Sequence, residues 1–153
     1  MAPAGRCSEA PRAVIDARNF SWPVTVYYED TDAAGVVYHA NYLRCMERAR
    51  TEWLFAMGFD HAALLRHDML FIVRSVAVEY LKPARLHDRL ETTVEVAKSG
   101  RCFLVFAQQL LRGSQILTNA TVKVVAVTTG SGGDPLKPVA MPYILRRKLE
   151  NFS

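Results

Sequence analysis

The sequence lacks any apolar run long enough to cross a membrane. Stretches such as VVAV at 124–127 fall far short of the roughly 20 apolar residues that a membrane-spanning helix needs. Residues 1–20 include three arginines, Arg6, Arg12 and Arg18, but no continuous apolar block of the kind found in a secretion signal. We therefore predict no membrane span and no export, with residues 1–20 forming a flexible extension ahead of a single domain at 21–153.

Paired cysteines are also missing. Cys7, Cys45 and Cys102 are odd in number, widely spaced and without a C-x-x-C pair. The sequence therefore lacks the cysteine patterns of zinc sites and redox-active dithiols. We expect reduced thiols in a cytoplasmic protein.

A strong charge of one sign is absent as well. The net charge is +4, and the one dense basic cluster is Arg146, Arg147 and Lys148 near the end of the chain. Proteins that bind nucleic acid usually carry a more extensive basic surface. The cluster therefore favours a solvated helix face over a nucleic-acid interface, while the mildly basic surface suits a ligand that carries phosphate groups.

The chain does contain enough apolar residues for one compact core. Half of its 153 residues are apolar, and a chain of this size buries about 68–70% of its unfolded surface when it folds. The apolar spacing predicts a long helix from Tyr42 to a stop at Gly58, and a short second helix at 61–66. The buried stripe of the long helix is expected to contain Tyr42, Leu43, Met46, Ala49, Trp53, Leu54 and Met57.

β-Branched and aromatic residues dominate five further segments. We predict strands at 22–28, 71–81, 89–98, 102–111 and 115–127, a turn region at 128–138 and a short terminal helix from Tyr143. In the last strand, alternate residues from Ile116 to Ala126 are expected to lie against a helix. This order indicates an α+β fold, in which an antiparallel sheet buries one face against the long helix. The open edges of such a sheet favour pairing in a symmetric dimer.

Three carboxylates lie between the first strand and the long helix, in YYEDTDAAGVVYHANY at 27–42. Asp32 precedes the expected helix start, at 38–41, by six to nine residues. The amides of a first helical turn lack intrahelical partners and carry the positive end of the helix dipole. A carboxylate beside such donors can attack a carbonyl carbon, or activate water to do so, while the donors stabilise the oxyanion. Taken alone, Asp32 also fits a turn-forming role, and His39 a role in lining the helix start.

This segment resembles the 4-hydroxybenzoyl-CoA thioesterase branch of the hotdog fold, and most closely its YbgC-like acyl-CoA thioesterases. The family pattern runs YYEDTDAGGVVYHANY followed by ERAR, and the chain departs from it at Ala34, where glycine is more usual. A second segment, VRSVAVEYLKPARLHDRLE at 73–91, is similar to a later block of the family, so the resemblance spans about 22–143. It implies a sheet wrapped around one central helix. It also implies hydrolysis of short-chain or aromatic acyl-CoA thioesters without a metal or organic cofactor.

The resemblance also assigns roles to individual residues. Asp32 is the expected catalytic carboxylate, an amide near Tyr38 the oxyanion donor, and His39 a group that orients water, substrate or the thiolate leaving group. The family works as homodimers or dimers of dimers, which implies a homo-oligomer up to a homotetramer. Basic residues expected to contact the phosphates of coenzyme A are Arg74, Lys82, Lys98 and Arg101. Further expected substrate contacts are Gly35, Val36 and Asn41 near the helix start, and Phe71, Ile72 and Val73 as an acyl-pocket wall supplied by a neighbouring subunit.

Three alternatives stay open at this point. Asp30 and Asp32 form an Asp-x-Asp pair that can hold a divalent cation, although no further acidic cluster is evident and the resemblance implies no metal. A hotdog dehydratase also acts on acyl thioesters, but it needs a different pairing of histidine and acidic residue. A non-catalytic module that binds acyl carrier protein or acyl-CoA through its basic rim would share the fold.

Overall fold

The computed structural model describes residues 20–130, 133 and 135–150. The predicted N-terminal extension therefore lies outside the described residues, except for Phe20. That residue begins the first strand and is buried in the core. None of the described helices is both long and apolar enough to cross a bilayer.

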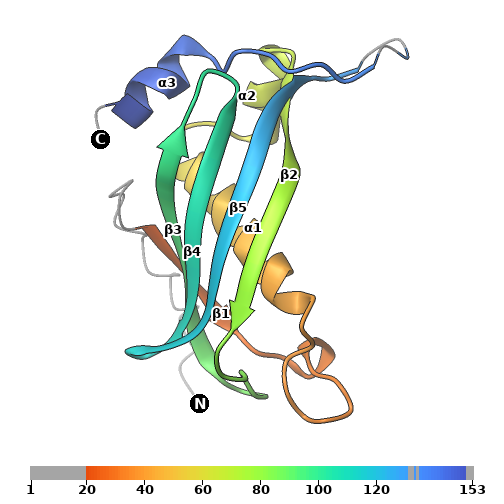
Figure 1. The fold of residues 1–153 in the computed structure, drawn as a ribbon, viewed down its shortest axis with the longest axis vertical. Helices are drawn as coiled ribbons and strands as arrows, with labels where there is room; N and C mark the ends of the chain where they lie inside the picture. Colours follow the sequence, from red (N-terminus) through yellow and green to blue (C-terminus); the bar gives the residue numbers. More distant parts are fainter. Residues whose placement is uncertain (1–19, 131–132, 134, 151–153) are drawn as a thin grey trace, which may run out of the picture.

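Five strands form one antiparallel sheet in the order β1-β3-β4-β5-β2, and a long helix crosses one face of it (Figure 1). This arrangement confirms the predicted α+β fold. β1 and β2 are the edge strands, because β1 pairs only with β3 and β2 only with β5 within the described chain. The strands are β1 (Phe20–Thr25), β2 (Met69–Tyr80), β3 (Arg89–Ser99), β4 (Phe103–Arg112) and β5 (Gln115–Thr128). The helices are α1 (Asn41–Ala56), α2 (His61–Arg66) and α3 (Tyr143–Glu150).

The first strand ends earlier than predicted. β1 stops at Thr25, and Tyr28 begins a short 3-10 helix, η1 (Tyr28–Asp30). The Asp30 carboxylate accepts the amide of Tyr27 at 2.8 Å, and the Asp30 amide donates to the Tyr27 carbonyl at 3.0 Å. These local hydrogen bonds outweigh the strand propensity of the two tyrosines, because a short carboxylate side chain competes with ladder pairing for the backbone.

The buried stripe of α1 differs from the prediction at one position. Leu43 is 36% exposed, whereas Cys45 is 7% exposed and lies in the core. Cys45 follows Tyr42 by three residues and precedes Ala49 by four, which places it on their face of the helix, while Leu43 is rotated from Tyr42 by about 100°. Burial raises the pKa of the Cys45 thiol.

The helix-facing side of β5 is predicted correctly except at its start. Alternate residues from Thr118 to Ala126 are buried, but Ile116 is 38% exposed. The β4–β5 pairing shifts register between Leu110 and Leu111, the partner of Ile116. This irregularity turns the beginning of β5 away from the helix.

Buried Gln108 connects α1 to the sheet. Its side-chain amide donates to the carbonyl of Met46 at 3.1 Å and to that of Thr93 at 3.2 Å, and its oxygen accepts from Arg50 at 2.8 Å. Burial lowers the pKa of Arg50, an effect that nearby Glu47 opposes. Because a buried polar group is costly unless it is paired, these bonds favour one position of α1 on the sheet.

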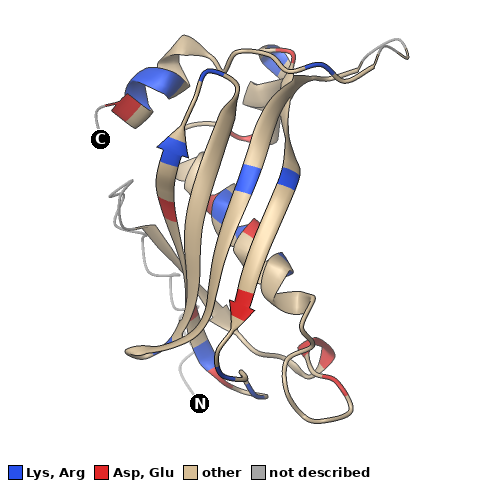
Figure 2. Ribbon diagram, in the orientation of Figure 1, with Lys and Arg blue, Asp and Glu red and all other residues tan. Residues whose placement is uncertain are grey.

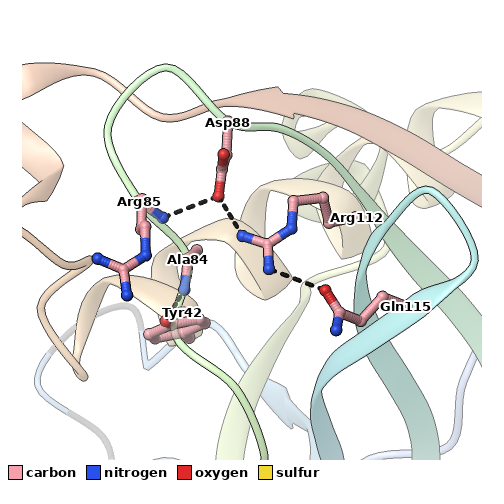
Figure 3. A network of polar contacts seen from close by, with 6 residues as sticks. All are labelled: Tyr42, Ala84, Arg85, Asp88, Arg112 and Gln115. Carbon is pink, nitrogen blue, oxygen red and sulfur yellow. Dashed lines mark hydrogen bonds and ion pairs between the residues drawn. The ribbon is translucent and has the colours of Figure 1, made fainter.

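A polar network holds the loop between β2 and β3 (Figure 3). The Asp88 carboxylate accepts from the Arg85 amide at 2.9 Å and from the Arg112 guanidinium at 2.7 Å. Arg112 also donates to the side chain of Gln115 at 2.8 Å. The loop is thereby joined to the hairpin between β4 and β5.

The same loop supports the segment that leads into α1. The Ala84 amide donates to the Tyr42 hydroxyl at 3.0 Å, and the Ala84 carbonyl accepts the Val37 amide at 2.9 Å. Val36 forms an isolated bridge with Arg85. The chain between Asp30 and α1 is therefore held against the β2–β3 loop.

Asp88→Asn is expected to lower the free energy of unfolding near neutral pH by about 1 kcal/mol or less, the usual range for a partly exposed ion pair. Burial raises the pKa of Asp88, but the hydrogen bonds from Arg85 and Arg112 and their charges lower it by more, so its folded-state pKa lies below the ordinary value. The stabilisation is thus complete above the unfolded pKa of about 3.9 and disappears as the pH falls through the folded pKa. Urea titrations of both proteins from about pH 6 to about pH 2 measure this loss. If the difference in unfolding free energy between the wild type and Asp88→Asn stays constant over this pH range, this role of Asp88 is contradicted.

Candidate active site

Asp32 lies at a hollow of about 310 Å³ beside the amino end of α1. One wall comes from the segment that precedes α1, and the other from the end of β2 and the loop that follows it. Four residues predicted for the site meet here: Asp32, Val36, His39 and Lys82. The other lining residues are Val37, Tyr42, Tyr80, Leu81 and Pro83.

The Asp32 side chain is anchored through one carboxylate oxygen. Its Oδ1 accepts the Ala34 amide at 2.8 Å, and its carbonyl accepts the Gly35 amide at 3.0 Å. Gly35 has a φ of +76°, which explains the need for glycine in this turn. None of the described residues donates to Oδ2, and the side chain is exposed. The turn therefore uses one oxygen of Asp32 and leaves the other available to water or substrate.

The free backbone donors lie immediately after Tyr38 rather than at Tyr38 itself. An amide near Tyr38 is the predicted oxyanion donor, and the amide of Tyr38 itself donates to the Asp30 carbonyl at 2.9 Å. The Asn41 amide donates to the Tyr38 carbonyl at 2.8 Å. Within the described part of the chain, the amides of His39 and Ala40 have no acceptor. The available donors are thus those of these two residues, of which His39 lines the same hollow as Asp32.

Two hydrogen bonds fix the direction of these free amides. In a trans peptide, the C=O and N–H groups share one rigid plane and point in opposite directions. The Tyr38 carbonyl accepts from Asn41, which fixes the plane that carries the His39 N–H. The His39 carbonyl accepts the Tyr80 hydroxyl at 2.8 Å, which fixes the plane that carries the Ala40 N–H. Both donors are therefore oriented before any ligand binds.

Tyr80 is a site residue that the sequence analysis missed. It is the last residue of β2, and its ring packs edge-on against His39, at 6.5 Å between centroids, and against Tyr42, at 5.2 Å. Burial and the neighbouring Tyr42 raise the pKa of Tyr80, so its hydroxyl keeps its proton and remains a donor. It stands in the second family-like segment, EYLKPA, but its partner lies 41 residues away in sequence.

Asp30 has a structural role in the same loop. Its Oδ2 accepts the Tyr27 amide at 2.8 Å, and its Oδ1 accepts the side-chain amide of Asn41 at 3.1 Å. Both oxygens therefore hold the turn and the start of α1, and the predicted substrate contact Asn41 has its side chain engaged here. Across residues 20–130, 133 and 135–150, no group of three or more histidine, cysteine or acidic side chains could hold a metal ion. The Asp-x-Asp interpretation gains no support from this geometry.

Most of the other predicted substrate contacts lie at the opposite end of the sheet. β2 rises about 3.3 Å per residue, so Phe71 and Tyr80 are roughly 30 Å apart along the strand. Phe71 and Val73 line a separate hollow of about 200 Å³ against α1. Figure 2 shows the acidic loop at one end of the molecule and basic residues on the β3–β4 hairpin and α3 at the other. The contacts that one chain does not bring to Asp32 are Phe71, Ile72, Val73, Arg74, Lys98 and Arg101.

Comparisons with known proteins show the family of the chain. Residues 26–149 match the thioesterase-like superfamily. An acyl-CoA thioesterase YbgC from Haemophilus influenzae is 47% identical over 124 residues, which cover 80% of this chain and 88% of that protein. An acyl-CoA thioester hydrolase YbgC from Escherichia coli is 48% identical over 126 residues, with coverages of 80% and 90%.

A solved structure extends the agreement to the fold. A probable thioesterase from Bartonella henselae matches with a TM-score of 0.74 and 28% identity, covering 81% of this chain and 99% of that one. Residues 26–149, which match the family model, include the Asp32 turn, the end of β2 and most of α3. These matches confirm the hotdog fold and the family that the sequence motifs predict.

Proposed function

Since the chain belongs to the thioesterase-like superfamily, and its relatives include acyl-CoA thioesterases, we propose that it hydrolyses short-chain or aromatic acyl-CoA thioesters with Asp32 as the catalytic carboxylate. One observation carries this proposal: Asp32, with one carboxylate oxygen free of described donors, and His39 line one hollow, and the unpaired amides belong to His39 and to Ala40, the next residue. A carboxylate and two oriented donors are the groups that acyl transfer to water requires.

The reaction proceeds through a tetrahedral intermediate. Asp32 either attacks the thioester carbon directly or takes a proton from a water molecule that attacks it. The carbonyl oxygen becomes negatively charged and accepts hydrogen bonds from the His39 and Ala40 amides. When the C–S bond breaks, the thiolate of coenzyme A leaves and takes up a proton that derives from the water consumed, with the imidazole of His39 as the proposed relay. In the water route, this is the proton that Asp32 accepted. In the direct route, water then hydrolyses the anhydride formed on Asp32.

A second subunit completes the site in this proposal. β2 is an edge strand whose Val73 and Val76 are 50% and 41% exposed. If two β2 strands pair antiparallel across a two-fold axis, the beginning of one strand lies beside the end of the other. Phe71 of the second subunit then approaches Tyr80 and the Asp32 hollow of the first. This arrangement explains why the predicted acyl wall and phosphate contacts lie far from Asp32 within one chain.

Thiol release from purified protein tests the function. We expect release of coenzyme A from short-chain or aromatic acyl-CoAs, followed with a thiol reagent. If a broad panel releases no thiol while acyl-CoA or acyl carrier protein still binds, the protein is a binding module. If the acyl group loses or gains water while the thioester stays intact, the protein is a dehydratase.

Tyr80→Phe is expected to lower kcat about tenfold with little change in KM, the effect of losing one net hydrogen bond of roughly 1.4 kcal/mol in the transition state. The variant keeps the ring but frees the His39–Ala40 peptide plane to rotate, so the Ala40 amide is no longer held in position. Steady-state kinetics with one acyl-CoA substrate measure the effects on kcat and on KM separately. Tyr143→Phe, which removes a hydroxyl from an exposed tyrosine on α3, is the matched control. An unchanged kcat in Tyr80→Phe would rule out this positioning role.

A further inference from the structure

Asp30 lies where the loop that carries Asp32 closes on the start of α1. We propose that Asp30 and Asn41 are positioning residues, which together orient the His39 amide toward the substrate carbonyl oxygen without touching the substrate themselves. This inference rests on the proposed function for the reaction that the amide serves. The hydrogen bonds that hold the amide are independent of that function.

The amino end of α1 lacks a side-chain cap. Ala40 stands at the N-cap position and has no side-chain oxygen for the amides of the first turn. Leu43, the third residue of the helix, cannot accept the Ala40 amide as a glutamate does in a capping box. The helix start is therefore left without its usual anchor, and the Ala40 amide is left without the acceptor that a capping box provides.

The Asp30 carboxylate supplies an anchor from outside the helix. Its Oδ1 accepts the side-chain amide of Asn41, the first residue of α1, at 3.1 Å, and its Oδ2 accepts the Tyr27 amide at 2.8 Å. The Asp30 carbonyl accepts the Tyr38 amide at 2.9 Å, which closes the loop around Asp32. Hydrogen bonds to a carboxylate are stronger than those between neutral groups. Because Asn41 donates through its side chain, the helix start is fixed without occupying a backbone amide.

Asn41 connects this anchor to the His39 amide. The main-chain amide of Asn41 donates to the Tyr38 carbonyl at 2.8 Å. That carbonyl lies in the same rigid peptide plane as the His39 N–H. Asn41 therefore binds Asp30 with its side chain and sets the direction of the His39 N–H with its main chain.

The two unpaired amides thus have separate supports. The Tyr80 hydroxyl, at the end of β2, holds the peptide plane of the Ala40 amide, and Asn41 holds that of the His39 amide. Donors that stabilise an oxyanion act best when they are oriented before the reaction begins. Tyr80 lines the hollow, whereas Asp30 and Asn41 do not, so these two residues act through position rather than through contact with the substrate.

Asn41→Ala removes the contact with Asp30 and keeps the main-chain amide. We expect kcat to fall about tenfold, the effect of losing one hydrogen bond to a charged group, while KM stays unchanged because the oxyanion forms only in the transition state. Asn119→Ala is the matched control. Asn119 is also half-buried and also makes one side-chain hydrogen bond, from Gln109 at 2.8 Å, on the face of β5 that points away from α1. Its kcat is expected to equal that of the wild type.

An exchange of the two side chains tests the contact itself. Asn41→Asp beside an unchanged Asp30 places two carboxylates at the contact, and kcat is expected to fall by roughly 10²-fold, the effect of displacing a reacting group by about 1 Å. Adding Asp30→Asn restores one amide and one carboxylate. The amide at position 30 can then donate to position 41 while its oxygen accepts the Tyr27 amide, so the double variant is expected to recover to within about threefold of the wild type. If it stays as inactive as Asn41→Asp, this contact does not position the amide.

Nuclear magnetic resonance relaxation of the backbone amides tests the inference without catalysis. The His39 amide is expected to have an order parameter of about 0.85 in the wild type, as for rigid backbone, and about 0.6 or less in Asn41→Ala. Asn119→Ala is expected to leave this value unchanged. Circular dichroism and thermal unfolding verify that each variant folds.

The two measurements separate the failure of this inference from the failure of the proposed function. If the wild type hydrolyses no thioester while the His39 amide loosens in Asn41→Ala, the function is wrong and the positioning contact stands. If the His39 amide is as rigid in Asn41→Ala as in the wild type, the inference is overturned. It is also overturned if an active wild type and Asn41→Ala share the same kcat, or if Asn119→Ala loses as much kcat as Asn41→Ala.

Discussion

Asp32→Asn is expected to lower turnover by roughly 10²–10⁴-fold while leaving the fold intact. An amide neither attacks a thioester carbon nor takes a proton from water at neutral pH. Its oxygen can still accept the Ala34 amide, which Asp32 Oδ1 does at 2.8 Å, so the turn persists. Thiol release gives kcat, and circular dichroism and thermal unfolding verify the fold.

Glu29→Gln is the control for this variant. Glu29 is an exposed carboxylate in η1, and its neutralisation removes the same charge from the same loop without touching the Asp32 turn. We expect its turnover to stay within about twofold of the wild type, as for an exposed charge outside the reacting groups. Near-normal hydrolysis by Asp32→Asn, or an equal loss in Glu29→Gln, would remove Asp32 from the mechanism.

The double variant Val73→Asp, Val76→Asp is expected to dissociate into monomers of 17.2 kDa. Its activity is expected to fall by roughly 10²-fold or more, which is the loss of rate caused by misplacing a reacting group. Both residues lie on the exposed edge strand β2. A two-fold axis brings each substitution to the interface twice, and charged side chains on an edge strand oppose edge-to-edge pairing. Light scattering reports the mass, and thiol release reports the activity.

Ile116→Asp is the control variant, because it places the same charged residue at an exposed apolar position that is not on the β2 edge. Ile116 is 38% exposed, close to the 41% of Val76, but it lies at the start of β5 beside β4. This variant is expected to keep the mass and activity of the wild type. A fully active monomer of the double variant would show that one chain holds the complete site.

The fold could be predicted from the sequence because its signals are local. The period of apolar residues and the β-branched runs give each helix and strand to within a few residues, as at 89–98 for β3 (Arg89–Ser99). The errors have two causes. Tyr28 leaves the predicted strand because of hydrogen bonds made by Asp30. Leu43 lies outside the buried stripe because it is rotated by about 100° from Tyr42 on the helix, whereas Cys45 lies within the stripe.

The site was predictable only where its residues are close in sequence. Asp32 and His39 belong to one motif, and the structure places both around the same hollow. Tyr80 was missed because its hydrogen bond to His39 spans 41 residues. Which amide near Tyr38 stays unpaired could not be predicted, because the bond from the Tyr38 amide to the Asp30 carbonyl depends on how η1 folds back, which no residue pattern displays.

β2 combines two tasks in one rigid element: one end carries the hydroxyl that orients the Ala40 amide, and the exposed edge carries the proposed contact with another subunit. A bulge between Val73 and Ser75 fixes the strand's register on β5, and a slip of one residue would send every side chain, Tyr80 included, to the other face. If the proposed dimer forms through β2, a change in this strand at the interface also changes the position of the Ala40 amide. Specific activity should then depend on protein concentration, falling steeply upon dilution below the dissociation constant of the proposed dimer.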